Sequence, residues 1–487
     1  MALRDYSSQG EMWGPSPDLA LPQGHLARAI DDIIEKLGIG RCNRKYLHTP
    51  GEAAYDVRCM AKILIYAYAR GITSSREMAR QCEENIAFQF LSRGQCPDFR
   101  TLSLFRRKKR LLLRWIFQQT VLLARQMGIA RLGPVALDSV KLAANASSAK
   151  SMTAAELVEQ VKKLDQYLVE VKATDQTEDS QYGANHRGDE LPADICAAQQ
   201  RKEKLQKALE ILQEQQATAK REPPKNVSIV DPEARWVKKQ GKFIRGYSAQ
   251  VAADAEQQVI VAVKAAAQPT DAEQLNPMLQ EIEKTAGEAP KQLVADSAYY
   301  TDDVVLEAAK SETDCVVPDS ETAAGLKDPK RSESEGGSYH ANRFTYDEAK
   351  DEFTCPQGKV LPYWGTHQSH GTTLRIYRCR DCDTCPVRAM CTSHASGFRS
   401  IEVRPDHAEV RKIRDKFKTD AVKAVYRRRK AIIEPVFGRW QHNWGVRRLR
   451  LRGLMGFSAE LHLLAIAHNL TKLFKVGQLL ACGAARA

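Results

Sequence analysis

Two short apolar runs, each ending in an aspartate, constrain the fold of this chain more than any other feature. Residues 134–138 read Pro-Val-Ala-Leu-Asp, and residues 293–296 read Leu-Val-Ala-Asp. Runs of this length and composition predict buried strands. Because working side chains gather at the carboxyl ends of strands in open α/β sheets, Asp138 and Asp296 can lie together if their strands are neighbours.

A single aspartate at the end of a strand is more often a helix cap or a turn residue than a catalytic group. Two adjacent carboxylates, however, repel each other unless a cation lies between them. A divalent metal ion supplies that cation and needs at least one further oxygen ligand. The paired pattern therefore indicates a metal site with a third, distant acid.

The best candidate for the third acid is Glu434, the only acid among ten Lys and Arg residues between positions 421 and 452. Residues 401–453 carry 16 basic and 6 acidic residues, which is +10 of the net charge of +13. Charge concentrated in this way favours a polyanionic partner. An ion-pair role for Glu434 is the alternative. Pro435 directly follows it and predicts a kink or a helix start there.

The order of the predicted elements indicates an α/β core that is interrupted twice. A helical pattern covers the N-terminal part, a capping box at Thr153 and Glu156 starts a helical hairpin, and residues 243–252 and 259–263 form a β-hairpin. We predict five parts: a flexible tail (1–20), a helical N-terminal domain (21–130), a mixed core (131–150, 223–320 and 411–478), a helical hairpin insertion (151–222) and a Cys-rich insertion (321–410). We expect the Tyr299–Tyr300 pair and the two histidines of the last helix, His462 and His468, to pack rather than to catalyse.

Five of the twelve cysteines fall in the second insertion, in the pattern Cys379-x2-Cys382-x2-Cys385-Pro-x4-Cys391, preceded by Cys355. In a chain whose first 24 residues lack a signal peptide, such clustering favours metal ligation over disulfides. Four thiolates suit structural Zn²⁺. An iron–sulfur cluster fits less well because its motif ends C-x3-C-P, and a metal-free loop is the third interpretation. Five candidates for four positions leave one over, which we predict to be Cys355.

Several motifs, taken in order, resemble those of bacterial insertion-sequence DDE transposases. Residues 135–147, 246–250, 294–300, 434–438 and 447–453 resemble the first-aspartate motif, the central strands, the second-aspartate motif and the glutamate block. Residues 68–75 and 97–100 are similar to the amino-terminal domain of the same group. The resemblance runs from about residue 24 to 475.

The resemblance implies an RNase H-like catalytic core in which Asp138, Asp296 and Glu434 bind two Mg²⁺ or Mn²⁺ ions. It implies DNA cleavage at terminal inverted repeats, strand transfer into target DNA, and a homodimeric synaptic complex on double-stranded DNA. The N-terminal helices and the basic segment would contact DNA. The implied DNA-binding residues are Arg106, Arg107, Lys141, Arg427, Arg429, Lys430, Arg439, Gln441, Arg447, Arg448, Arg450 and Arg452.

The glutamate block departs from the pattern of this family. Many members carry Tyr seven and Arg four residues before the glutamate, and Lys seven residues after it. Here these positions hold Arg427, Lys430 and Gln441, and Tyr426 is one residue out of step.

A catalytically decayed relative that only binds DNA is the alternative function, although such a protein would have no reason to keep the complete acidic triad. No apolar run approaches the roughly 18 residues of a membrane span, so we expect a cytoplasmic bacterial protein associated with the nucleoid and not with a membrane.

Overall fold

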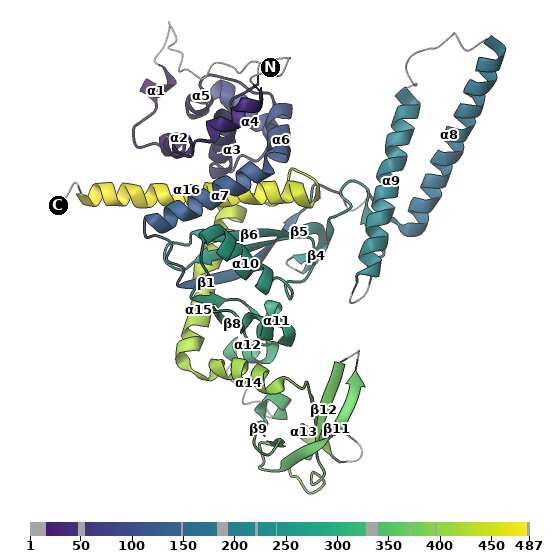
Figure 1. Ribbon diagram of the computed structural model, residues 1–487, viewed down its shortest axis with the longest axis vertical. Coiled ribbons are helices and arrows are strands. Elements are labelled where there is room, and N and C mark those ends of the chain that lie inside the picture. The colour runs from purple at the N-terminus through teal and green to yellow at the C-terminus, as the bar shows by residue number, and fades with distance from the viewer. Residues whose placement is uncertain are drawn as a thin grey trace. The chain divides into compact units, whose positions relative to one another are not determined.

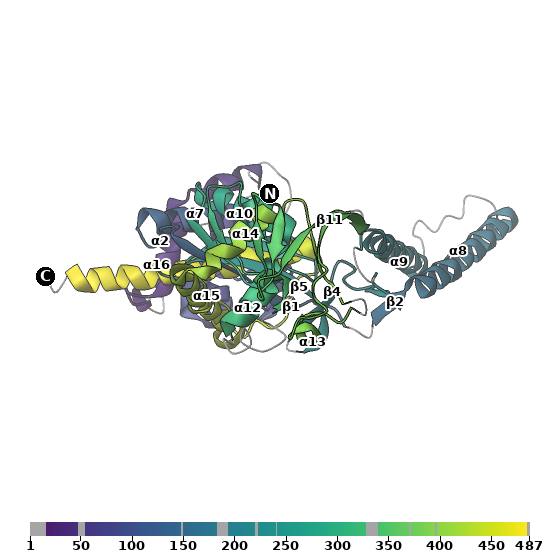
Figure 2. The ribbon, with the colours of Figure 1, turned by 90° about the horizontal axis from the view of Figure 1, so that it is seen from below.

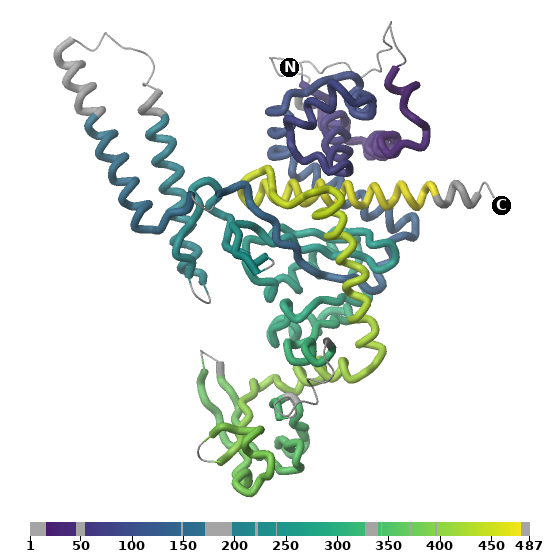
Figure 3. Tube along the Cα trace, turned by 180° about the vertical axis from the view of Figure 1, so that it is seen from behind, coloured from purple at the N-terminus to yellow at the C-terminus, as the bar shows by residue number. Residues whose placement is uncertain are grey.

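The computed structural model describes residues 16–46, 54–147, 150–182, 193–219, 223–239, 241–327, 339–369, 372–394 and 397–484, and the remaining residues are drawn in grey in Figure 3. The chain divides into two compact units. Unit 1 comprises Met1–Arg131, Ser139–Pro269 and Glu434–Ala487, and unit 2 comprises Leu132–Asp138 and Thr270–Ile433. Among the described residues, no helix has the length and hydropathy needed to span a membrane. The structure is mixed α/β, as predicted.

Unit 1 begins with helices. They are α1 (Pro17–Ala20), α2 (Leu26–Lys36), α3 (Val57–Ala69), α4 (Ser75–Glu84), α5 (Ile86–Ser92), α6 (Phe99–Lys108) and α7 (Arg110–Gln126). All of these except α1 fall in the predicted helical domain, whereas α1 lies within the segment predicted to be a flexible tail. The long C-terminal helix α16 (Gly453–Ala484) packs on α3, α7 and strand β6. In Figure 1 it passes between the N-terminal helices and the strands of unit 1.

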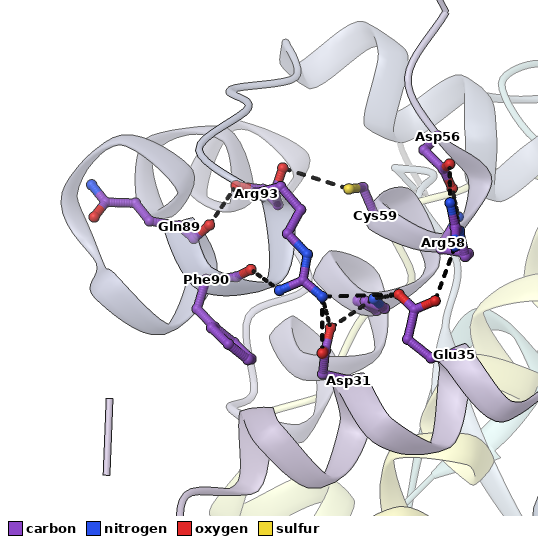
Figure 4. Close-up of polar contacts among 10 residues, drawn as sticks. Asp31, Glu35, Asp56, Arg58, Cys59, Gln89, Phe90 and Arg93 are labelled. Carbon is purple, nitrogen blue, oxygen red and sulfur yellow. Dashed lines mark hydrogen bonds and ion pairs between the residues drawn. The ribbon is translucent and has the colours of Figure 1, made fainter. Parts of the chain in front are cut away.

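A buried polar cluster fixes α3 against α2 and α5 (Figure 4). Lys62 is fully buried, and its Nζ lies 2.6 Å from Asp31 Oδ1 and also contacts Glu35. Arg93 reaches Asp31 at 3.0 Å, and Arg58 reaches Glu35 at 3.0 Å. Because each buried charge has an opposite charge beside it, the desolvation cost of the cluster is offset.

The sheet of unit 1 is built around β5 (Lys242–Asp254), which pairs antiparallel with β4 (Arg235–Lys239) and with β6 (Ile260–Ala266). The predicted β-hairpin is therefore confirmed. Strand β1 (Pro134–Ala143) neighbours β5 and is shared, because its residues up to Asp138 belong to unit 2 and those from Ser139 onward belong to unit 1.

The predicted helical hairpin is present as α8 (Ala154–Tyr182) and α9 (Ala193–Ala217), which lie side by side in Figures 1 and 2. The capping box forms as expected: the Thr153 N–H donates to Glu156 Oε2 at 2.7 Å, and the Glu156 N–H donates to Thr153 Oγ1 at 3.4 Å. The short strands β2 (Ser151–Thr153) and β3 (Asn226–Ser228) pair at its base.

Unit 2 contains two sheets. In the first, β1 pairs parallel with β7 (Gln292–Val294), which pairs parallel with β8 (Asp314–Val316). The second is antiparallel, in the order β13 (Arg399–Val403), β12 (Thr372–Cys379), β11 (Val360–Ser369), β10 (Glu352–Thr354) and β9 (Thr345–Asp347). The helices are α10 (Leu275–Ala286), α11 (Asp302–Ala308), α12 (Ser320–Lys327), α13 (Arg388–Cys391), α14 (His407–Asp415) and the first part of α15 (Asp420–Gly438).

Two local predictions are wrong. Strand β1 does not end at Asp138 but continues to Ala143, because Val140 and Leu142 extend its buried alternation. Of the two alternatives predicted at Pro435, the helix start is wrong, because α15 runs through this residue and into a π-helical turn at Arg439–Asn443; the kink stays a prediction. The pre-proline bias against helix is only a bias, and the buried side chains of Ile433 and Val436 on either side of Pro435 hold the helix in place.

Candidate active site

The register of the parallel strands in unit 2 brings Asp138 and Asp296 to the same level. Ala136 of β1 pairs with Val294 of β7, and each aspartate follows two residues later. Both side chains are partly buried, and Asp296 caps the short helix Ser297–Tyr299 by accepting the Ala298 N–H at 2.9 Å. The register therefore places the two carboxylates level with each other, with Asp138 inside β1 and Asp296 just beyond the carboxyl end of β7, which is the end of a strand where α/β sheets place their working groups.

Helix α15 presents a cation and a phenol to this aspartate pair. Arg429 Nη1 donates to Asp138 Oδ2 at 2.7 Å, with 7% of the Arg429 side chain and 23% of the Asp138 side chain exposed. Tyr426 lies one helical turn earlier, on the same face. Burial raises the pKa of Tyr426, and the negative charges of Asp296 and Asp138 raise it further against the opposing charge of Arg429.

The residues that face the aspartates are thus Tyr426 and Arg429, whereas Arg427 and Lys430, at the family positions counted back from the glutamate, are both exposed. The signal in the sequence was the spacing of three between Tyr426 and Arg429, which places two side chains on one helix face. Counting seven and four residues back from Glu434 points instead to Arg427 and Lys430, so the family pattern did not identify Tyr426 and Arg429.

Glu434 lies on α15 in the stretch that belongs to unit 1, and its side chain is exposed. The structure therefore brings together the two aspartates within unit 2, and it describes Glu434 with unit 1.

A groove of about 570 Å³ opens in unit 2 between α12, α14 and α15. Three acids line it, namely Asp319, Glu321 and Asp415, and Arg414 pairs with Asp319 at 2.9 Å. Six cationic side chains also line it: Arg343, Arg411, Arg414, Lys418, Lys423 and Arg427. This excess of positive charge suits a phosphate backbone. Among these six cations, Arg427 is the one that the sequence analysis names as a DNA-binding residue.

Two of the predicted DNA-binding arginines are not available to a phosphate. Arg106 is buried and donates to Tyr68 Oη and to the Thr73 carbonyl oxygen at 3.0 Å each, so it joins N-terminal helices instead. Arg429 is buried against Asp138. Lys141 donates to Ser139 Oγ and Ser248 Oγ. The other predicted residues are exposed or partly exposed: Arg107, Arg427, Lys430, Arg439, Gln441, Arg447, Arg448, Arg450 and Arg452.

All five cysteines of the Cys-rich segment line one small cavity of about 20 Å³ in unit 2. Among the residues that the structure describes, no group of three or more His, Cys, Asp or Glu side chains is placed to hold a metal ion. The Mg²⁺ and Zn²⁺ sites therefore stay predictions.

The two histidines of α16 are packed, as expected. His462 Nδ1 is 2.7 Å from the Ser458 carbonyl oxygen, and His468 Nε2 is 2.9 Å from that of Gln258. Burial lowers the pKa of His462 to about 4 and that of His468 to about 3, so both rings are neutral at physiological pH.

Comparison with known protein families gives two matches. Residues 16–108 match the family described as "Transposase domain (DUF772)", and residues 354–474 match the family described as "Transposase DDE domain". No curated protein matches the chain. The two matches indicate that this chain is an insertion-sequence DDE transposase.

Proposed function

We propose that the protein cleaves DNA at the inverted-repeat ends of a transposon and joins those ends to target DNA, with an RNase H-like core as its catalytic part. The observation that carries this proposal is the matched register of Asp138 and Asp296 on adjacent parallel strands, each two residues past the paired Ala136 and Val294. A decayed relative that only binds DNA would have no need for this pair. We further propose a homodimer, because two transposon ends must be processed together.

Asp138, Asp296 and Glu434 are the residues that would bind Mg²⁺ or Mn²⁺. Their carboxylate oxygens are the ligands that these hard cations prefer. Bound there, two such ions would stabilise the attacking and leaving oxygens of an in-line displacement at phosphorus. In the structure Arg429 supplies the positive charge beside Asp138, with its Nη1 2.7 Å from Asp138 Oδ2.

The groove of unit 2 would hold the DNA backbone close to α15. Arg427 lines the groove, while Tyr426 and Arg429 on the same helix face the aspartates. Successive residues of an α-helix point about 100° apart, so one helix serves both purposes. The groove cations position phosphates and carry no sequence information.

A second surface of unit 2 is proposed to contact DNA. Trp364 on β11 is 46% exposed, and the guanidinium carbons of Arg378 and Arg380 lie 5.0 and 4.2 Å from its ring centroid. Residues 359–380 contain no Asp or Glu. An exposed aromatic ring with arginines stacked on it, and with no acid in this stretch of chain, suits a nucleic acid better than an acidic protein.

The proposed function is tested by incubating purified protein and Mg²⁺ with DNA that carries the inverted repeats flanking its gene. Asp138→Asn, Asp296→Asn and Glu434→Gln should each abolish cleavage while still binding the DNA. Glu312→Gln, which changes an exposed acid of unit 2, is the matched control and should cleave normally. Cleavage by the three variants at the wild-type rate would refute the site assignment.

A further inference from the structure

We propose that helix α6 (Phe99–Lys108) reads the base sequence of the transposon end, with its exposed face in the major groove of duplex DNA. This inference rests on the proposed function and deepens it, because it names the helix and the side chains that give the protein its preference for one DNA sequence. Arg100 and Leu104 would contact base edges, and Arg107 would contact a phosphate.

Helix α6 differs in charge from the helices that precede it. It carries four basic residues and no Asp or Glu, and the stretch from residue 99 to 137 has nine basic residues and no acid. In contrast, α2 and α4 each carry two basic and three acidic residues, and α5 carries no charge. The two cations of α3 pair with acids in the buried polar cluster. Because a DNA surface needs positive charge that acids do not neutralise, α6 is the first helix of the chain that suits one.

The exposed side chains of α6 form one face. Arg100, Leu104, Arg107 and Lys108 are exposed, at the i, i+4, i+7, i+8 spacing that defines one side of a helix. The rest of the helix packs on α3, α4 and α16. A helix of 10 residues is about 15 Å long, and the major groove of DNA is about 12 Å wide. The face can therefore lie across the floor of the groove.

The buried side chain of Arg106 fixes which face of α6 is exposed. Its Nη1 donates to the Tyr68 hydroxyl and to the Thr73 carbonyl oxygen at 3.0 Å each, and its Nη2 donates to Ser75 Oγ. These partners belong to α3, to the loop that follows it and to the first turn of α4. Successive residues of a helix point about 100° apart, so anchoring Arg106 inward directs Leu104 outward. A side chain can discriminate between bases only from a fixed orientation of this kind.

Two arginines meet at the N-terminal end of this face. The guanidinium carbons of Arg100 and of Arg76, which is exposed on α4, lie 5.6 and 4.9 Å from the centroid of the Phe99 ring. The nearby acid, Asp98, is engaged within the helix, where it accepts the N–H groups of Arg100 and Thr101 at 2.6 and 3.2 Å. Arginine held in this way suits the O6 and N7 acceptors of guanine, and the first residues of a recognition helix are those that contact base edges.

Leu104 distinguishes base reading from phosphate binding alone. It is 40% exposed and lies on the same face as Arg100 and Arg107, although a phosphate offers nothing to an apolar side chain. In the major groove thymine presents a methyl group, which gives such a side chain a specific contact. The two aromatic residues of α6, Phe99 and Phe105, are partly buried, so the face lacks the exposed rings on which single-stranded bases stack. Duplex DNA is therefore the ligand that this face fits.

The test measures DNA binding by the full-length protein in metal-free buffer, where the proposed cleavage cannot occur. Fluorescence anisotropy compares the inverted repeat that flanks the gene with a scrambled duplex of the same length. Arg100→Ala should lower the affinity for the repeat about 5- to 150-fold. Arg100→Lys keeps the charge but not the bidentate geometry, so it should bind the scrambled duplex as the wild type does and still lose the preference for the repeat. Leu104→Ala should reduce that preference, and Arg107→Gln should weaken both duplexes equally.

Arg80→Gln is the matched control, because Arg80 is exposed on α4 but pairs with Glu77 at 2.8 Å; it should bind both duplexes as the wild type does. The inference is overturned if Arg100→Ala and Arg100→Lys keep the wild-type preference for the repeat. It is also overturned if the wild type prefers neither duplex, or binds the single-stranded repeat more tightly than the duplex.

These outcomes are distinct from a failure of the proposed function. Asp138→Asn should not cleave DNA but should keep the wild-type preference for the repeat, because Asp138 lies outside α6. Wild-type protein that prefers the repeat but never cleaves it would refute the proposed function and leave α6 as the reading helix. Protein that cleaves the repeat while Arg100→Lys keeps its preference would refute the role of α6 alone.

Discussion

The ion pair between Arg429 and Asp138 predicts a specific link between stability and metal. Replacing Arg429 with Met removes the positive charge and keeps most of the side-chain volume. The variant leaves the Asp138 carboxylate beside Asp296 without its 2.7 Å partner. We expect unit 2 to be destabilised in metal-free buffer.

The size of the effect follows from distance and burial. At 2.7 Å and an effective dielectric constant of about 20, the attraction between the two charges is about 6 kcal/mol before desolvation is counted. Removing one partner of a fully buried pair costs about 3–5 kcal/mol. Because 23% of the Asp138 side chain is exposed, water offsets part of this loss, and we expect about 2–3 kcal/mol.

Thermal unfolding followed in excess EDTA measures the loss. For a unit of this size the expected decrease in melting temperature is roughly 4–12 °C. Arg428→Met is the matched control, because Arg428 directly precedes Arg429 on α15 and is exposed. Added Mg²⁺ should narrow the difference between Arg429→Met and the wild type, since a bound cation replaces the lost positive charge and stabilises the folded state.

Two results would refute this reasoning. If Arg429→Met and Arg428→Met have the same melting temperature as the wild type in EDTA, the ion pair contributes nothing to the stability of unit 2. If Mg²⁺ leaves the difference unchanged, Asp138 does not bind the metal.

Three further predictions follow from other parts of the structure. Trp364→Ala should weaken DNA binding, measured by fluorescence anisotropy, by about 1–3 kcal/mol. Val360→Ala, which changes another exposed residue of β11, should bind DNA as the wild type does. Equal DNA affinities of Trp364→Ala and the wild type would show that this surface does not contact DNA. Arg427→Gln should reduce the slope of log K against log salt concentration by about 1, and Lys310→Gln, an exposed cation outside the groove, should not. Burial lowers the pKa of His462 to about 4 from about 6.5 in the unfolded chain. The stabilising contribution of the neutral His462 ring is therefore complete above pH 6.5 and is lost as the pH falls towards 4. His462→Leu should reduce the pH dependence of the free energy of unfolding in this range by up to about 1.4 kcal/mol per pH unit. An unchanged pH dependence of the free energy of unfolding would contradict this assignment.

Local sequence signals predicted the elements well, because the interactions that form them are local. The capping box of Thr153 and Glu156 needs only four residues, and both of its backbone hydrogen bonds are present. The strands that carry the two aspartates were visible as apolar runs. That they are adjacent and in register was not visible, because pairing depends on contacts between residues far apart in the chain.

The arginines show where the sequence is insufficient. Arg106 stands in a run of five basic residues that reads as an exposed surface, yet it is buried. Its guanidinium donates to the Tyr68 hydroxyl and the Thr73 carbonyl oxygen, and its pKa is raised by Tyr68 and Glu460 against the effect of burial. None of these partners is a sequence neighbour, so the charge run alone could not identify the buried member.

The same limit applies to α15 and sharpens the meaning of the basic segment. Arg427, Arg428 and Arg429 are consecutive, but helical geometry points them about 100° apart. Arg427 lines the groove, Arg428 is exposed and Arg429 contacts Asp138. Three identical side chains therefore have three environments. We expect Arg427→Gln to change the salt dependence of DNA binding and Arg429→Met to lower the melting temperature in metal-free buffer. Arg428→Met should change neither property. The basic segment 401–453 therefore does not form one uniform basic patch, because the phase of α15 divides these three arginines between the groove of unit 2, the exposed surface and the aspartate pair.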